Sequence, residues 1–467
     1  MVILLLSGIF FYMFAGAVTF IVPAVIILST FFCGIMISGT VNQGKKKVLF
    51  LSGLVINLGL LVFFKYINFI ITSTFEGINF ISKIIWSEHV LKGSSVFLKL
   101  IIPLGISFIT FQAVGYLIEI YRGSHIPEKN LGVFATYLLF FPKLLSGPIE
   151  RAHNFIPQLR LKHELNYEQI VEGLKRILWG LFLKIVVADR LALYTDAVFN
   201  NCRQHSGITL LVASVFFTVQ LFSDFAGYTS IAIGSARILG YRLMENFNSP
   251  FMAKSIAEFW GRWHISLSNW LRDYLFLPLS YSVARRAMKK SYKVFKVEYI
   301  SYITGILITM TICGIWHGAS WNFVIFGFLQ GFIMTVELLT RKVRKKVKKI
   351  IPSWLDTLGG MGFTFAVFSF TTIFFKANTV TDAFFIVGKI FTASGPFYIG
   401  EWQQIIYCFL AVFLLLIVSL SQEYSVKKSL QLKPKYWFIS QIGYVFLIIL
   451  ILLIGVFDGG QFIYFQF

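Results

Sequence analysis

The stretch Ile312-Cys313-Gly314-Ile315-Trp316-His317-Gly318-Ala319-Ser320-Trp321-Asn322 sets one histidine among small and aromatic residues, between the apolar runs 299–315 and 319–338. An ionisable side chain at membrane depth is costly, so such a histidine is a candidate functional residue by default. The alternative is a packing histidine at a helix break, and the local pattern leaves both interpretations open. Cys313 is a candidate nucleophile, although a cysteine in such a place is more often a small buried apolar residue.

The composition around this stretch is that of a membrane protein. Of 467 residues, 57% are hydrophobic and only 13% are charged, which is far more apolar than a soluble domain. Runs of about 20 apolar residues recur along the whole chain, and each is long enough to cross a bilayer. The net charge of +21 comes from basic residues in short loops, which is typical of cytoplasmic loops. We therefore expect anionic lipids or an anionic cytosolic donor as partners, and no nucleic acid.

The apolar pattern predicts an all-α polytopic membrane protein. Residues 73–97 are expected to form a mixed loop, and the densest basic run, 341–349, a cytoplasmic one. The four cysteines and seven histidines show no ligand spacing, so no bound metal is expected. The segments expected to span the membrane are 17–38, 48–72, 98–120, 177–199, 208–234, 299–315, 319–338, 358–376, 405–421 and 438–456.

Two segments do not fit as simple spans. Residues 131–149 and 263–283 are each flanked on both sides by basic loops, which would place both of their ends in the cytoplasm. The first contains Pro142 and Pro148, which break helices. The second mixes tryptophans with charged residues. We expect the first to be re-entrant and the second to be re-entrant or interfacial, since irregular backbone at membrane depth must lie inside protein or along a water-filled cavity.

Five short motifs follow one another along most of the chain. They are residues 111–123, 140–149, 224–234, 259–274 and 314–321, and the C-terminal 461–467 is consistent with them. Together they resemble the membrane-bound O-acyltransferase family, and within it the bacterial alginate O-acetyltransferase branch. Members of this branch have a further apolar helix before the part that matches residues 3–38, and that helix is expected to be missing from this chain.

The resemblance implies a fold, a location and a domain organisation. It implies a funnel-shaped bundle of about 10–12 transmembrane helices with re-entrant or interfacial helices, in the cytoplasmic (inner) membrane as a multi-pass protein. It also implies one domain over residues 1–467, with a catalytic core at about 98–340. The family's invariant histidine corresponds to His317, and its second conserved position corresponds to His264.

The chemistry of acyl transfer gives each of these positions a role. A neutral imidazole, with an ordinary pKa near 6.5, accepts the proton that an attacking hydroxyl loses, so we expect His317 to be the general base and His264 to assist it. Asp224 is interpreted either as part of a structural ion pair or as the group that holds the imidazole tautomer, and Asn322 as an oxyanion donor. The remaining supporting or tunnel residues are expected to be Trp316, Arg262, Trp263, Ser266, Arg272 and Asp273.

The resemblance implies O-acetylation of an extracytoplasmic polysaccharide. The acyl donor is expected to be acetyl-CoA or an acyl-carrier-protein thioester from the cytosol, with no tightly bound cofactor. The acceptor is a sugar hydroxyl or an extracytoplasmic acetyltransferase partner, and His317 should be reachable from both faces of the bilayer. The alternatives are D-alanyl transfer from a carrier protein to teichoic acid, and a transporter or flippase built on Asp224, Glu119 and the re-entrant segments.

Overall fold

The structure is a computed structural model that describes residues 1–86, 97–145, 147–289, 294–425 and 437–457. These residues form helices and connecting segments without any β-strand, which confirms the all-α prediction. The terminal segment 461–467 of the family resemblance lies outside the described residues.

Seven helices in the described part of the chain are long and apolar enough to cross a membrane, and two shorter apolar helices, Val2–Phe14 and Gln441–Ile454, add to them. The protein is therefore a multi-pass membrane protein. The seven are Ala17–Gly39, Gln43–Ile85, Gly207–Ile238, Lys296–His317, Trp321–Leu339, Ser353–Lys376 and Trp402–Ser421.

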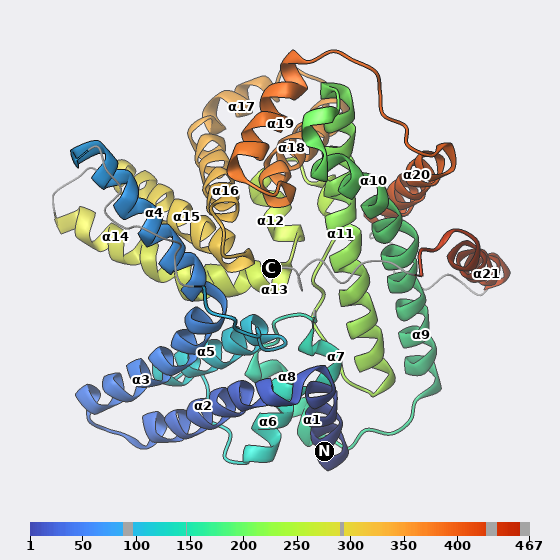
Figure 1. The fold of residues 1–467 in the computed structure, drawn as a ribbon. Helices are drawn as coiled ribbons and strands as arrows, with labels where there is room; N and C mark the ends of the chain where they lie inside the picture. The colour runs from blue at the N-terminus through green and yellow to red at the C-terminus, as the bar shows by residue number, and fades with distance from the viewer. Residues whose placement is uncertain (87–96, 146, 290–293, 426–436, 458–467) are drawn as a thin grey trace. The chain divides into compact units, whose positions relative to one another are not determined.

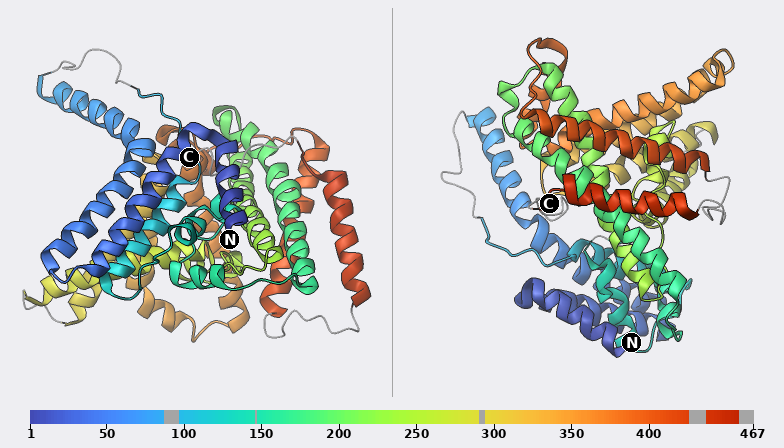
Figure 2. Two further views of the ribbon diagram at one scale, coloured as in Figure 1. Left: turned by 90° about the horizontal axis from the view of Figure 1, so that it is seen from below. Right: turned by 90° about the vertical axis from the view of Figure 1, so that its right-hand side faces the viewer.

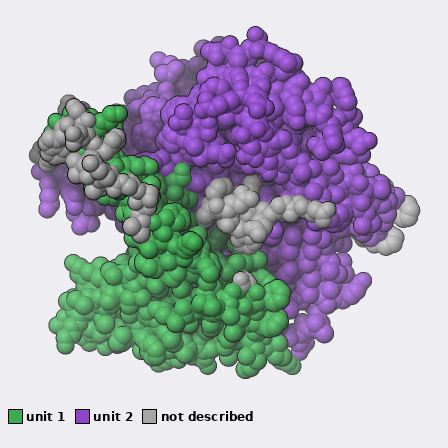
Figure 3. Space-filling view, in the orientation of Figure 1, with its two compact units in different colours: residues 1–145, 149–162, 318–320 green, residues 146–148, 163–317, 321–467 purple. Residues whose placement is uncertain are grey.

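By its internal contacts the chain divides into two compact units, coloured separately in Figure 3. The first comprises residues 1–145, 149–162 and 318–320, and the second comprises residues 146–148, 163–317 and 321–467. The prediction of a single domain over 1–467 stays a prediction.

In the first unit, three helices pack side by side: α2 (Ile21–Gly39), α3 (Gln43–Leu61) and α5 (Ile106–Arg122) (Figure 1). The predicted loop at 73–97 is wrong over its first half, because α3 continues through a π-helical turn into α4 (Ile67–Trp86). Helix α1 (Val2–Gly16) packs on α6.

The described part of the segment 131–149 contains two short helices, and a third begins shortly after it. Helix α6 (Leu131–Leu139) ends at Phe140, where ψ turns to 102°, and α7 (Phe141–Leu144) follows. Helix α8 (Ala152–Arg160) comes next. An α-helix rises about 1.5 Å per residue, so neither α6 nor α7 reaches across a hydrocarbon core of about 30 Å. This agrees with the interpretation that 131–149 is not a simple span.

In the second unit, α9 (Tyr167–Leu181) and α11 (Gly207–Ile238) lie side by side, as Figures 1 and 2 show. Two glycine pairs make their contact close. A methyl group added to Gly180 would lie 2.6 Å from the carbonyl oxygen of Gly227, and one on Gly173 would lie 2.7 Å from that of Gly234. Small residues at such positions allow helices in membranes to approach closely.

Helix α9 continues through the π-helical residues 182–188 into α10 (Asp189–Asn200). This run, which includes the predicted span 177–199, is not among the seven candidate spans. It carries Lys184, Asp189 and Arg190 in its middle. That it crosses the membrane stays a prediction.

The helices on either side of the opening motif pack tightly on each other. Helix α15 (Val294–His317) and α16 (Trp321–Leu339) meet at two glycines, Gly314 and Gly327. A methyl group on Gly327 would lie 2.3 Å from the carbonyl oxygen of Met310 on α15. Helix α18 (Ser353–Lys376) packs on both α16 and α11. The end of α15 is therefore held by direct backbone contact.

The segment 256–289 is helical with one break, at Trp263 and His264. Helix α12 (Ile256–Arg262) precedes the break, and α13 (Ile265–Leu271) follows it. Helix α13 then runs through the π-helical residues 272–276 into α14 (Leu277–Lys289). None of this is among the candidate spans, so its predicted interfacial or re-entrant position remains a prediction.

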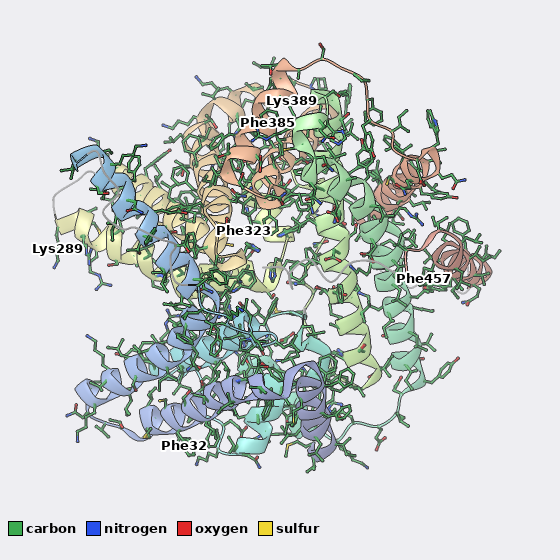
Figure 4. All side chains as sticks on the ribbon, in the orientation of Figure 1. Phe32, Lys289, Phe323, Phe385, Lys389 and Phe457 are labelled. Carbon is green, nitrogen blue, oxygen red and sulfur yellow. The ribbon has the colours of Figure 1, made fainter. Side chains whose placement is uncertain are left out.

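The last helices of the second unit pack on different neighbours, the first of them on α11 and the other two on the run from α9 to α10. Helix α19 (Val380–Thr392) carries Phe385 and Lys389, both labelled in Figure 4. The Lys389 ammonium lies over the Phe385 ring at 5.2 Å and donates a hydrogen bond to the carbonyl oxygen of Arg203. Helices α20 (Trp402–Ser425) and α21 (Trp437–Ile454) follow.

Candidate active site

His317 is the last residue of α15, and aromatic side chains surround it. Its ring centroid lies 4.9 Å from that of Trp316, 5.3 Å from Phe375 and 6.2 Å from Phe326. The side chain is only 3% exposed. One turn earlier on the same helix, the Cys313 sulfur lies 4.0 Å from Nε2 of His317. The sequence thus places the imidazole at a helix end, inside an aromatic cluster.

His264 lies at the break between α12 and α13 in a left-handed backbone conformation, with φ 42° and ψ 54°. A left-handed conformation is unusual for a residue other than glycine, and it costs about 1–3 kcal/mol that the surrounding structure must offset. The ring is fully buried. Its Nδ1 lies 3.1 Å from Oδ1 of Asn246, and the Phe225 ring packs edge-on at 4.6 Å.

The two histidines belong to one cluster. The Trp316 ring, itself 5% exposed, lies 5.9 Å from the His264 ring and 4.9 Å from the His317 ring. Burial, and after it the nearby His317, lowers the pKa of His264 well below its ordinary value. His264 is therefore neutral at physiological pH. The structure brings together the two histidines that the sequence singled out, with Trp316 touching both.

Of the residues predicted to support the site, Trp263 and Ser266 lie next to His264. The Trp263 ring stacks on Phe259 at 5.4 Å, and it lies 5.4 Å from Phe368 of α18. Ser266 donates hydrogen bonds from both its backbone N–H and its hydroxyl to Oδ1 of Asn246. These contacts fix the backbone on both sides of His264.

Arg262, Arg272 and Asp273, which the sequence also assigned to the site, each take part in an ion pair. The Arg262 guanidinium binds both carboxylate oxygens of Glu423 on α20, at 2.7 and 3.1 Å, and pairs with Glu258. This bidentate pair fastens α12 to α20. Arg272 pairs with the adjacent Asp273 at 2.8 Å, and the arginine side chain is 57% exposed. Exposed pairs of this kind contribute little to stability.

Asp224 takes part in a buried ion pair, one of the two roles that the sequence left open. Nζ of Lys184 lies 2.7 Å from Asp224 and 2.6 Å from Asp189, so one ammonium bridges two carboxylates. The Lys184 ammonium also lies over the Tyr228 ring at 5.4 Å. The interpretation that Asp224 holds an imidazole tautomer stays a prediction.

Asn322 lies in the first turn of α16. Its Nδ2 donates a hydrogen bond of 2.6 Å to the carbonyl oxygen of Ala377, just past the end of α18. An amide nitrogen has two protons, and this bond uses one of them. The predicted role of Asn322 as an oxyanion donor is untested, whereas its role in tying α16 to α18 is visible in this contact.

Two cavities lie close to these residues in the second unit. One of about 500 Å³ is lined by Phe222, Phe247 and Ile265, and by Ser419 of α20, with Arg176 and Glu245 on its wall. Phe247 also contacts Phe225 and Trp263, which surround His264. The larger cavity therefore shares a wall with the environment of His264.

A smaller apolar cavity of about 230 Å³ is lined by residues of α12, α13 and α15, and by Arg272. In the described residues, no three histidine, cysteine, aspartate or glutamate side chains form a group that would hold a metal ion.

Asn246 is the site residue that the sequence did not indicate. It is fully buried and precedes His264 by 18 residues, in a segment without helix or strand. The sequence holds only a weak indication of this residue: Asn246 and Asn248 flank Phe247, and Pro250 follows in the same loop.

The candidate site is thus a buried histidine pair inside a multi-pass helical membrane protein. Residues 124–377 match the model of the membrane-bound O-acyltransferase family, and this match includes both histidines. The chain belongs to the membrane-bound O-acyltransferase family, and its enzyme class is accordingly O-acyltransferase.

Curated relatives cover three related activities. The chain is 33% identical to a probable alginate O-acetylase of Azotobacter vinelandii over 78% of this chain and 66% of that protein. It is 31% identical to a peptidoglycan O-acetyltransferase of Helicobacter pylori over 81% of this chain and 71% of that protein. It is 30% identical to a teichoic acid D-alanyltransferase of Bacillus subtilis over 57% of this chain and 67% of that protein. The chain thus spans about two thirds of the length of these relatives.

Proposed function

We propose that the protein transfers an acyl group, most simply acetyl, from a cytosolic thioester across the membrane for O-acetylation of an extracytoplasmic polysaccharide. His317 is the general base. The observation that carries this proposal is the buried pair of His317 and His264 around Trp316, inside the segment that matches the O-acyltransferase family.

The chemical step needs one base and one acid at the same place. The acceptor hydroxyl attacks the thioester carbonyl carbon while His317 takes its proton. The tetrahedral intermediate then expels the thiolate, which recovers that proton from the imidazolium, so the products are an ester and a free thiol. General-base catalysis of this kind contributes roughly 10²–10⁴-fold, and the positioning of both substrates contributes more.

The donor is proposed to be acetyl-CoA or an acyl-carrier-protein thioester, without a tightly bound cofactor. The cavity of about 500 Å³ that Ile265 lines supports donor entry near Arg176, whose guanidinium pairs with Glu245 at 2.6 Å and would exchange that carboxylate for a donor phosphate. The acceptor is proposed to be a sugar hydroxyl or an extracytoplasmic acetyltransferase partner. The protein is proposed to lie in a bacterial cytoplasmic membrane. The basic run 341–349 is proposed to bind anionic lipids of that membrane.

The test compares His317→Ala with His205→Ala, a matched histidine substitution in the loop before α11. Sealed proteoliposomes receive labelled acetyl-CoA outside and an acceptor oligosaccharide inside, or the reverse, and mass spectrometry counts the acetyl esters. We expect His317→Ala to lose roughly 10²–10⁴-fold in rate, while His205→Ala keeps the rate. A folded His317→Ala protein with undiminished transfer would remove His317 from this role.

D-alanyl transfer to teichoic acid is the second candidate, supported by the 30% identity to the Bacillus subtilis relative. Both reactions pass an acyl group from a thioester to a hydroxyl, so the same histidines serve either. The same vesicles supplied with D-alanyl carrier protein in place of acetyl-CoA separate the two reactions. Transfer from the D-alanyl carrier alone would replace the acetyl assignment.

A further inference from the structure

A buried amide oxygen connects His264 to the loop before α12. Oδ1 of Asn246 accepts hydrogen bonds from the backbone N–H of Ser266 at 3.2 Å and from the Ser266 hydroxyl at 2.9 Å, and it lies 3.1 Å from Nδ1 of His264. The backbone carbonyl of Asn246 also accepts from the N–H of Ile265 at 2.9 Å. Asn246 is therefore fixed at both its backbone and its side chain.

The backbone N–H of Ser266 determines which way the Asn246 amide faces. A backbone N–H can only donate, so the side-chain atom opposite it must be the amide oxygen and not the NH₂ group. The amide nitrogen, Nδ2, is buried without a hydrogen-bond partner among the described residues. A residue that served only to fill space would not bury such a group, because an unsatisfied donor is costly. The asparagine is therefore present for its oxygen.

The amide orientation in turn determines the tautomer of His264. The amide oxygen has no proton to give, so Nδ1 of His264 must carry the proton that this hydrogen bond needs. The hydroxyl of Ser266 lies 3.5 Å from the same Nδ1 but only 2.9 Å from the amide oxygen, so its proton belongs to the oxygen. In the neutral ring, Nε2 then holds the lone pair.

We infer that Asn246 is a positioning residue that holds His264 as the Nδ1–H tautomer and presents its Nε2 as a hydrogen-bond acceptor within the histidine cluster. The left-handed backbone of His264 supports this inference, because strained backbone is kept where the surrounding structure fixes it and is concentrated at functional sites. The relevance of the tautomer to turnover rests on the proposed acyl transfer, whereas the tautomer itself does not.

Nitrogen-15 magnetic resonance of histidine-labelled protein in lipid vesicles tests the tautomer without any substrate. The signals that disappear in His264→Gln belong to His264, and we expect them to show a protonated Nδ1 and an unprotonated Nε2 near neutral pH. Asn246→Ala should release the ring into both tautomers. Asn246→Asp keeps an acceptor oxygen and should retain the Nδ1–H form, as should Ser266→Ala, which leaves the bond to His264 intact. A wild-type ring protonated at Nε2, or an unchanged ring in Asn246→Ala, would overturn the inference.

Steady-state rates test the consequence for turnover. In metal sites, groups that hydrogen-bond the far ring nitrogen of a ligating histidine are worth about 10- to 100-fold in activity. By the same orienting effect, Asn246→Ala should lower kcat by about that factor with KM nearly unchanged, and Asn246→Asp should restore part of it. An equal loss in both variants would indicate damage to the fold and contradict the positioning role. Should His317→Ala keep full activity, the proposed function fails while the tautomer result stands on its own.

Discussion

The contact between Gly314 and Gly327 makes a quantitative prediction about the position of His317. In Gly327→Ala, the new methyl group would lie 2.3 Å from the carbonyl oxygen of Met310 and 2.8–2.9 Å from the backbone of Gly314. All of these are backbone atoms, which cannot turn aside as a flexible side chain can. Ordinary contact begins near 3.4 Å, so we expect α15 and α16 to separate locally by about 1 Å.

The size of this shift decides which property changes most. Overpacking costs about 1–3 kcal/mol, and replacing glycine by alanine within a helix returns about 1 kcal/mol, so the net loss of stability should be small. His317, the proposed general base, lies one turn beyond Gly314 on α15, and a displacement of about 1 Å in a catalytic group can lower the rate about 100-fold. We therefore expect Gly327→Ala to fold with a modestly lowered Tm but to lose most of its kcat.

Gly331→Ala is the matched control, one turn further along the same face of α16. Its methyl group would lie 3.1 Å from Cα of Leu307 and 3.2 Å from the carbonyl oxygen of Ile306, so the helices need to move by only a few tenths of an ångström. Acetyl transfer and thermal unfolding are measured for both variants in the same vesicles. Normal turnover by Gly327→Ala, or equal loss in the two variants, would refute the claim that this glycine contact positions His317.

Three further predictions concern stability and substrate access in the second unit. Gly180→Ala should lower the Tm because its methyl group meets the backbone of α11, whereas Gly359→Ala, with no heavy atom within 4 Å, should not. In the unfolded chain His264 takes up a proton below about pH 6.5, whereas its lowered pKa keeps it neutral in the folded chain. The free energy of unfolding should therefore fall as the pH drops below about 6.5, and it should fall less in His264→Gln. Ser419→Trp should fill the cavity of about 500 Å³ and raise KM for the proposed thioester donor about tenfold or more, which corresponds to ~1.4 kcal/mol of binding free energy. Leu416→Trp, on the exposed side of α20, should leave KM unchanged.

Where the sequence predicted the structure well, the signal was local. Apolar runs of membrane length predicted the helices, and prolines and basic flanks predicted that 131–149 would not be a simple span. The histidine of the opening stretch ends α15 directly before Gly318, at the junction between the two apolar runs. Each of these features depends on a few residues that are neighbours in the sequence, so it can be predicted from the sequence alone.

What the sequence did not predict depends on contacts between distant segments. The bridge from Lys184 to Asp224 joins residues 40 apart, and the bond from Arg262 to Glu423 joins residues 161 apart. Asn246 lies in an irregular loop, where no periodicity shows which way a side chain points. The extension of α4 to Trp86 was missed because polar residues interrupt the apolar pattern there, although a helix tolerates them on one face.

The shared aromatic surroundings of His264 and His317 constrain how the reaction cycle must close. Both rings are buried and touch the same indole, so two imidazolium ions there would repel each other with little water to solvate them. A positive charge on one ring therefore disfavours a second positive charge on the other. In the proposed acyl transfer, a proton taken from the acceptor hydroxyl must leave before the next attack. The thiolate that departs from the proposed thioester donor is a base released at this place, so in that reaction donor cleavage both completes the transfer and resets the site.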